Sequence, residues 1–110
     1  MEKRTHERLP SKLHARLVYG NLFYAGSVTN FSENGVFLKA KMNLDVNSVL
    51  VLVLLISDRI VNVLGKVKRA VKPLEHKKNT ESGMGVELLN PPVRYLEFVK
   101  EQRIANDSVI

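Results

Sequence analysis

Apolar and polar side chains alternate along most of the chain from residue 11 onward, and this period of two is typical of β-strands with one buried face. In the segment 12–19, KLHARLVY, every second residue is apolar or aromatic and the others are mostly basic. Short sequences rich in Gly, Asn, Ser and Asp separate such segments and favour turns. Six strands are predicted, at residues 12–19, 22–29, 35–41, 49–56, 59–72 and 83–89. Strands at this hairpin spacing favour a small antiparallel barrel.

A helix is predicted after the last strand. Asn90-Pro91-Pro92 ends the sheet and places a proline at an early helical position, where its missing amide is tolerated. Val93, Leu96 and Val99 then form one apolar stripe. The predicted fold is mainly β, a six-stranded antiparallel β-barrel with a C-terminal α-helix. Its parts are a flexible arginine-bearing arm at 1–9, the barrel and helix at 10–103, and a frayed tail at 104–110.

The fifth predicted strand carries two further expectations. Its alternation places one apolar column along the strand, and a glycine interrupts that column. Glycine inside a strand is typical of a bulge or a sharp bend, so one is expected at Gly65. The column consists of Val61, Val63, Gly65, Val67 and Val71.

Length and composition limit the class of protein. A chain of 110 residues without cysteine is expected to form one domain without disulfides or thiolate metal ligands, which suits the cytoplasm. The N-terminus, MEKRTHER, lacks the apolar segment of a signal peptide. The longest apolar run, 49–56, is eight residues, whereas a spanning helix needs about 20. We expect no membrane insertion and a cytoplasmic location.

Positive charge is concentrated in two places. Residues 1–16 carry five Lys or Arg against two Glu, which is half of the net charge of +6. A second cluster follows Gly65 and consists of Lys66, Lys68, Arg69 and Lys72. Such a balance favours anionic partners, such as a nucleotide, nucleic acid or an acidic membrane surface. We interpret the second cluster as an ordinary solvent-exposed face.

Groups for catalysis are scarce. His6, His14 and His76 lie in three separate segments, and none has the spacing of a metal ligand pair. No pair of acidic residues stands out as an acid and base couple. Gly83-Met84-Gly85 lacks the third glycine and the following helix of a dinucleotide fingerprint. The sequence therefore predicts a binding protein rather than an enzyme, with no cofactor and no metal.

Two motifs predict binding. RTHER places Arg4 and Arg8 four residues apart, and guanidinium groups bind phosphate, guanine edges and base faces. NFSENG supplies the Asn30 amide, the Ser32 hydroxyl and, at Gly35, a backbone able to adopt positive φ. An amide can read a base edge, and a hydroxyl suits phosphate. Each motif alone is also ordinary for a basic arm or a turn.

Together the motifs resemble the PilZ domain family, in which Arg-x-x-x-Arg precedes [Asp/Asn]-x-Ser-x-x-Gly. The segment GMGVELL at 83–89 looks like that family's closing strand, and the following helix also fits. Asn30 stands where Asp is common, and Leu88 stands where an aromatic residue is frequent. The resemblance implies a six-stranded barrel whose outer surface binds the bacterial second messenger cyclic di-GMP.

The resemblance also implies roles for individual residues. The two arginines would contact guanine faces and phosphates, the asparagine would hydrogen-bond a guanine edge, and the serine would reach polar groups of the ligand. The glycine would keep the turn tight, and a basic residue precedes the first arginine. The residues so implied are Lys3, Arg4, Arg8, Asn30, Ser32 and Gly35. One ligand or a stacked pair is compatible with the motifs.

A stand-alone module of this kind would signal through its arm. The arm has little apolar surface to bury, so binding of the dianionic ligand is expected to order it against the barrel. A partner protein in a motility, pilus or polysaccharide system would then recognise the new surface. The sequence leaves open whether the protein is a monomer or a homodimer.

Two other functions share parts of this pattern. A single-stranded nucleic-acid-binding barrel would be basic, but such barrels use aromatic stacking platforms. This chain has only seven aromatic residues and no tryptophan, which disfavours nucleic acid. A ligand-independent adaptor of the same fold is the second alternative, although adaptors usually lack the arginines or the Asn and Ser pair, which this chain keeps.

Overall fold

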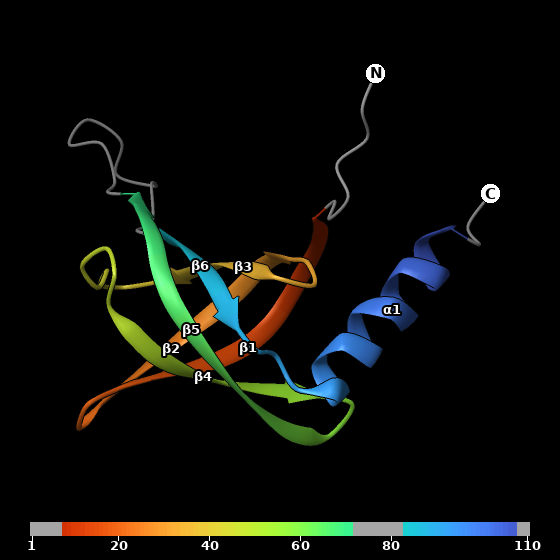
Figure 1. Cartoon of the computed structure of the whole chain (residues 1–110), viewed down its shortest axis with the longest axis horizontal. Helices are drawn as coiled ribbons and strands as arrows, with labels where there is room; N and C mark the ends of the chain where they lie inside the picture. The colour runs from red at the N-terminus through yellow and green to blue at the C-terminus, as the bar shows by residue number, and fades with distance from the viewer. Residues whose placement is uncertain (1–7, 72–82, 108–110) are drawn as a thin grey trace.

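The computed structural model describes residues 8–71 and 83–107. It confirms the predicted six-stranded antiparallel barrel with one C-terminal helix (Figure 1). The barrel is closed in the order β1-β2-β3-β6-β5-β4. The elements are β1 (Leu9–Tyr19), β2 (Leu22–Phe31), β3 (Gly35–Ala40), β4 (Val49–Ile56), β5 (Arg59–Val71), β6 (Gly83–Leu89) and α1 (Val93–Asp107).

The core fills the barrel with the inward-facing half of the alternating residues. Every strand contributes aliphatic side chains that are almost fully buried, as the alternation predicts. The barrel closes where β1 pairs with β4, over residues 15–18 and 51–54. The buried set includes Leu17, Val28, Val36, Leu38, Leu50, Leu52, Leu54, Val63, Val67 and Met84.

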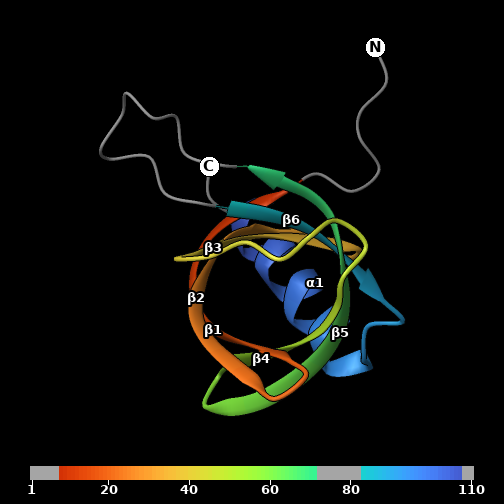
Figure 2. The same ribbon diagram turned by 90° about the vertical axis from the view of Figure 1, so that its left-hand side faces the viewer.

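Helix α1 covers one end of the barrel, where it is visible through the ring of strands (Figure 2). Its buried face is formed by Tyr95 and Val99, both with 0% exposure, and by Phe98, whose ring stacks on Phe31 with centroids 5.3 Å apart. The predicted stripe was therefore wrong in part, because Val93 is 69% exposed and Leu96 is exposed. Tyr95, Phe98 and Val99 lie at spacings of three and four residues, so they share one face of the helix.

Several boundaries differ from the prediction. Strand β1 begins at Leu9 rather than residue 12, and α1 continues to Asp107, so 104–107 belong to the helix. Strand β2 continues to Phe31, which places Asn30 inside a strand and not in the turn. The connection from β2 to β3 is therefore only three residues long, 32–34. The predicted arm lies outside the described residues except for its last two positions.

The irregularity in β5 lies beyond Gly65. Gly65 pairs regularly with Leu50 and Leu88, whereas the register with β6 shifts between Val67 and Arg69. The predicted position of the bulge, at Gly65, was therefore wrong. This glycine is needed for packing, since a Cβ atom there would lie 2.5 Å from Cγ1 of Val86.

The bulge also changes which residues of β5 face the core. Val67 is buried, but the next inward position is taken by Ala70, which pairs with Met84. Val71 is 39% exposed, so its predicted place in the apolar column was wrong. The extra residue in the strand reverses the alternation from that point on.

Candidate functional site

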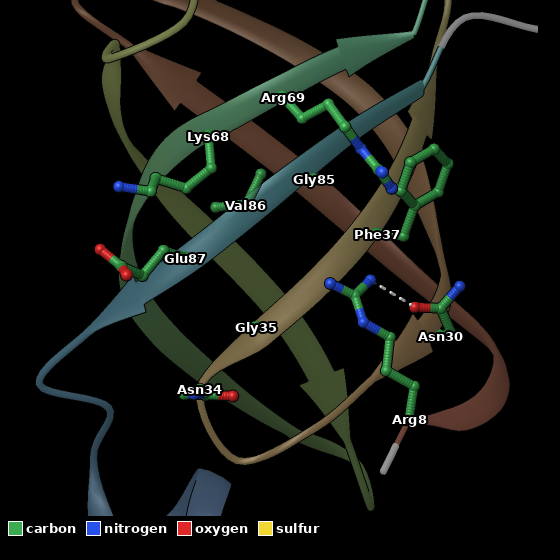
Figure 3. A pocket seen from close by; sticks show the side chains of 10 residues that line it. All are labelled: Arg8, Asn30, Asn34, Gly35, Phe37, Lys68, Arg69, Gly85, Val86 and Glu87. Carbon is green, nitrogen blue, oxygen red and sulfur yellow. Dashed lines mark hydrogen bonds between the residues drawn. The ribbon is translucent and has the colours of Figure 1, made fainter. Parts of the chain in front are cut away.

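A row of cross-strand neighbours crosses the outer surface of the barrel. Pro10 pairs with Asn30, Asn30 with Phe37, Phe37 with Gly85, and Gly85 with Arg69. Directly paired residues project to the same face of a sheet. The row therefore brings positions of β1, β2, β3, β6 and β5 to one face, and Figure 3 shows Asn30, Phe37, Gly85 and Arg69 of this row around one pocket.

A bulge in β2 determines where Asn30 points. The register with β3 shifts between Val28 and Asn30. As a result both Val28 and Phe31 face the core, with 0% and 2% exposure, although they are three residues apart. Asn30, between them, faces outward. Its Oδ1 accepts a hydrogen bond of 2.8 Å from Nη1 of Arg8, twenty-two residues earlier (Figure 3).

Glycines form the floor of the pocket and allow larger side chains to lie across it. A Cβ atom on Gly85 would be 3.8 Å from Nε of Arg69, and one on Gly35 would be 3.9 Å from Nη2 of Arg8. A Cβ atom on Gly83 would be only 2.5 Å from the ring of Phe37. The Phe37 ring therefore lies close to the backbone at Gly83, and the Arg69 and Arg8 side chains pass near the backbone at Gly85 and Gly35.

Gly35 has a different role from the one expected. Its φ is not in the left-handed region, which among the described glycines is occupied by Gly20. Gly35 is the first residue of β3 and pairs with Glu87. A side chain there would approach the Val86 carbonyl oxygen to 3.3 Å and would lie under Arg8. Close approach of other groups therefore explains this glycine better than turn geometry.

The pocket is an open depression of about 730 Å³, within the usual range for small-molecule sites. Three cationic side chains and one carboxylate border it, which gives a net positive lining. Such a lining attracts anions. The lining residues are Arg8, Asn30, Asn34, Gly35, Phe37, Lys68, Arg69, Gly85, Val86 and Glu87.

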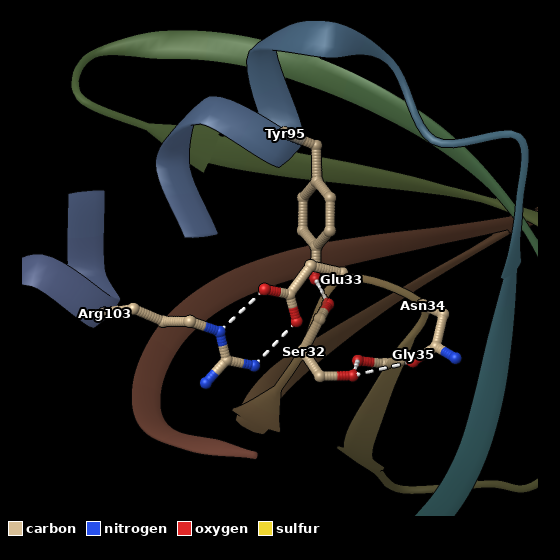
Figure 4. Close-up of polar contacts among 6 residues, drawn as sticks. All are labelled: Ser32, Glu33, Asn34, Gly35, Tyr95 and Arg103. Carbon is tan, nitrogen blue, oxygen red and sulfur yellow. Dashed lines mark hydrogen bonds and ion pairs between the residues drawn. The ribbon is translucent and has the colours of Figure 1, made fainter. Parts of the chain in front are cut away.

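Ser32 lies behind the pocket wall rather than in its lining. Its side chain is buried, and Oγ donates to Oδ1 of Asn34 at 3.0 Å (Figure 4). Its backbone N–H donates to the Gly35 carbonyl oxygen at 2.8 Å. Ser32 therefore shapes the turn and holds the side chain of Asn34, which does border the pocket. Direct contact of Ser32 with a ligand stays a prediction.

Helix α1 fastens this turn from the other side (Figure 4). The Tyr95 hydroxyl donates to the Ser32 carbonyl oxygen at 2.6 Å. Arg103 forms a two-pronged ion pair with Glu33, with Nε to Oε2 at 2.7 Å and Nη2 to Oε1 at 2.6 Å. Burial is the main cause that raises the pKa of the Tyr95 phenol, and Glu33 raises it further. The phenol therefore stays protonated at neutral pH and donates its hydrogen bond to the Ser32 carbonyl oxygen.

The structure brings together part of the predicted site. Arg8, Asn30 and Gly35 meet at the pocket, whereas Lys3 and Arg4 lie outside the described residues. Sequence reasoning missed the residues from later strands, above all Phe37, Arg69 and Gly85. The adjacent cations Lys68 and Arg69 were a usable signal for a bulge in this strand, because two consecutive charged residues break the strict alternation of apolar and polar residues.

Residues 8–71 and 83–107 contain no group of three or more His, Cys, Asp or Glu arranged to hold a metal ion. Over the same described part of the chain, no helix combines the length and the hydropathy required to cross a membrane.

The sequence pattern that defines the PilZ domain matches residues 2–102. A comparison with curated proteins gives no match. Among solved structures, the chain is similar to the inhibitor of motility MotI/DgrA from Bacillus subtilis, with a TM-score of 0.76 and 14% identity over 96% of this chain and 53% of that one.

Two structures bound to cyclic di-GMP are also similar. The complex of MrkH from K. pneumonia gives a TM-score of 0.72 and 13% identity, over 94% of this chain and 52% of that chain. The PilZ domain of YcgR from Escherichia coli gives 0.66 and 11%, over 98% of this chain and 100% of that chain. At such identities the likeness shows the fold. The chain spans about half the length of the MotI/DgrA and MrkH chains.

Proposed function

Because the chain belongs to the PilZ domain family, we propose that it is a receptor for the second messenger cyclic di-GMP and binds it on the outer face of the barrel. Similar structures of MrkH and of the YcgR domain contain this ligand. The observation that carries the proposal is the hydrogen-bonded pair of Arg8 and Asn30, from two separate motifs, at one cationic pocket.

The chemistry of this pair suits the ligand. Guanine presents O6 and N7 as acceptors, which a guanidinium group can bind with two parallel hydrogen bonds. The Asn30 amide offers both an acceptor and a donor for the polar edge of the base. Arg8 already donates to Asn30, so its guanidinium is held near the place where a base would bind. Less side-chain freedom is then lost on binding.

The proposal extends to Lys3 and Arg4, which lie outside the described residues. Arg4 would supply a second guanidinium from the same arm, and binding would order the arm against the barrel. The ordered arm and the ligand would present a surface to an effector protein in a motility, pilus or polysaccharide system. Titration with cyclic di-GMP should shift the amide resonances of residues 3–9, and unchanged resonances would contradict this part of the proposal.

Isothermal titration calorimetry with cyclic di-GMP tests the receptor function. We expect micromolar or tighter binding, and a loss of tenfold or more in Arg8→Ala, because charge-assisted hydrogen bonds contribute about 1.5–3 kcal/mol. Arg59→Ala is the matched control: Arg59 is an exposed arginine at the start of β5 and does not line the pocket. The stoichiometry distinguishes one bound ligand from two.

Two further titrations separate the alternatives. GTP and a short single-stranded oligonucleotide are added under the same conditions. Salt-sensitive binding of the oligonucleotide without binding of cyclic di-GMP would favour a nucleic-acid-binding barrel. No binding of any of the three would contradict the receptor function and leave a ligand-independent adaptor.

A further inference from the structure

We infer that Arg69, supported by Lys68, forms a second ligand-binding wall of the pocket, which takes the phosphate and base at the end of a cyclic dinucleotide that Arg8 does not reach. This inference rests on the proposed function and assigns β5 a part in binding that neither of the two sequence motifs contains. It makes Arg69 a determinant of affinity for the complete dinucleotide.

The bulge in β5 creates this wall. In a regular strand, consecutive side chains point to opposite faces, so only one of two adjacent cations would face the pocket. The register with β6 shifts between Val67 and Arg69, and Lys68 is the extra residue. Lys68 and Arg69 are both exposed and both line the pocket. Bulges commonly redirect side chains beside binding sites in this way.

Arg69 ends the cross-strand row at β5, and Asn30 lies in β2, next to Pro10 at the other end. They are separated by β3 and β6, which corresponds to three strand spacings or about 14 Å along the barrel wall. Gly85 lies between them, and the Arg69 side chain crosses it toward Phe37 (Figure 3). Arg69 therefore reaches over the middle of the row from the β5 side, whereas Arg8 and Asn30 form the β2 side of the pocket. A ligand with two equivalent halves fits this arrangement.

The charges of the lining agree with a ligand that carries two phosphates. Arg8, Lys68 and Arg69 are opposed by the single carboxylate of Glu87, so the described lining has a net charge of +2. The cations come from two sides of the pocket, with Arg8 just before β1 and Lys68 and Arg69 in β5. Each phosphate of a cyclic dinucleotide can then lie near a cation, and the forked guanidinium group of Arg69 can bind a phosphate or a guanine edge.

Calorimetric titration of cyclic di-GMP into four variants tests the inference. We expect Arg69→Ala to weaken binding about tenfold and Lys68→Ala to weaken it about threefold. The difference arises because a guanidinium group can form two parallel hydrogen bonds, whereas an ammonium group is a single point charge. Arg69→Lys should recover part of the loss, since it restores the charge but not the fork. Arg59→Ala, on the same strand but away from the pocket, should leave the affinity unchanged.

The double variant Arg8→Ala/Arg69→Ala shows whether the two walls are separate. If the two arginines contact different halves of the ligand, their effects should multiply. A double variant no weaker than Arg8→Ala alone would place both side chains on one group and overturn the inference. The double variant is measured at millimolar ligand so that weak binding is still quantified.

A variant of the floor provides an independent test. A Cβ atom on Gly85 would meet Arg69 at 3.7–3.8 Å, an ordinary contact distance, so Gly85→Ala should unfold at the same temperature as the unmodified protein. The added methyl group would nevertheless raise the floor between the walls, and binding should weaken at least fivefold. Unchanged binding in both Gly85→Ala and Arg69→Ala would overturn the inference.

These outcomes separate the inference from the proposed function. If the unmodified protein does not bind cyclic di-GMP, the receptor function fails and the inference fails with it. If the protein binds, Arg8→Ala weakens binding tenfold or more, and Arg69→Ala binds as tightly as the unmodified protein, then the receptor function stands and only the second wall is refuted.

Discussion

The Tyr95 hydroxyl lies 2.6 Å from the Ser32 carbonyl oxygen and joins the buried face of α1 to the turn that borders the pocket. Tyr95 is 0% and Ser32 is 2% exposed, so water cannot replace this hydrogen bond. The same turn supplies Asn34 to the pocket lining. The helix at the end of the barrel therefore supports the candidate site without contacting it.

Tyr95→Phe should destabilise the protein by about 1–3 kcal/mol. The substitution keeps the ring in the core but leaves the buried Ser32 carbonyl oxygen without its donor. Urea unfolding followed by circular dichroism measures the free energy of unfolding. Tyr19→Phe is the matched control, because Tyr19 is 38% exposed, and its free energy should change by less than about 0.5 kcal/mol. Equal stability of Tyr95→Phe and the unmodified protein would show that the hydrogen bond contributes nothing.

The raised pKa of Tyr95 predicts a loss of stability at alkaline pH. An unfolded tyrosine has a pKa of about 10, whereas burial keeps the folded phenol protonated to higher pH. Below pH 10 the Tyr95 phenol is protonated in both the folded and the unfolded state, so its full contribution to stability is present. Above it only the unfolded state releases the proton, so the free energy of unfolding falls by at most about 1.36 kcal/mol per pH unit.

Comparison with Tyr95→Phe isolates this effect from the other titrating groups. The free energies of unfolding of both proteins are measured between pH 8 and pH 11. The difference between them should be constant up to about pH 9.5 and should shrink above it, because only the unmodified protein has the buried phenol. A difference that stays constant to pH 11 would contradict a raised pKa.

The Glu33–Arg103 ion pair should contribute modestly to stability and also support the site. The two side chains are 30% and 24% exposed, so solvent screens the pair in part. We expect Arg103→Ala to cost about 1 kcal/mol of unfolding free energy. Glu33 precedes Asn34, which lines the pocket, so the same variant should leave this part of the pocket wall less ordered. Binding of cyclic di-GMP should then weaken about twofold to fourfold, because ordering the wall costs free energy on binding.

A charge swap distinguishes the ion pair from general damage at the two positions. Glu33→Arg/Arg103→Glu should recover part of the stability and of the affinity that either single reversal loses. Arg94→Ala is the control on the same helix, because Arg94 is exposed and borders a depression beside the β4–β5 turn. If the double reversal is as unstable as the sum of the two single reversals, the pair is not coupled.

Local alternation made the six strands predictable, because every second residue of each strand is buried in a closed barrel. The bulges could not be located in the same way. A bulge inserts one residue, and the sequence on either side still alternates normally. Val71 was therefore placed in the core by its distance from Val67, although Ala70 occupies the inward position.

The candidate site was predictable only where a motif marks it. Arg8 and Asn30 are recognised from their motifs, but Phe37, Gly85 and Arg69 meet them through the register of four strands. That register depends on bulges in β2 and β5, and of the two only the bulge in β5 has a local sequence signal, the consecutive cations Lys68 and Arg69. In α1, the aliphatic residues Val93 and Leu96 misled the prediction, because the helix buries its larger aromatic side chains instead.

The turn between β4 and β5 stores strain that two substitutions should relieve. Ser57 and Asp58 have φ values of 49° and 64°, in the left-handed region that disfavours residues with a Cβ atom. The pair Ile56 and Arg59 closes a two-residue hairpin around them. A turn with positive φ at both positions prefers Asn-Gly. Ser57→Asn/Asp58→Gly should therefore raise the free energy of unfolding by about 1–2 kcal/mol.

Thermal unfolding measures this gain, which corresponds to roughly 4–8 °C per kcal/mol for a domain of this size. Asp58→Ala is the control, since alanine removes the carboxylate but keeps a Cβ atom at positive φ, and it should give no gain. The turn lies at the end of β4 and the start of β5, and neither residue lines the pocket, so the affinity for cyclic di-GMP should not change. If Asp58→Ala stabilises as much as the double substitution, charge rather than backbone strain determines the stability of this turn.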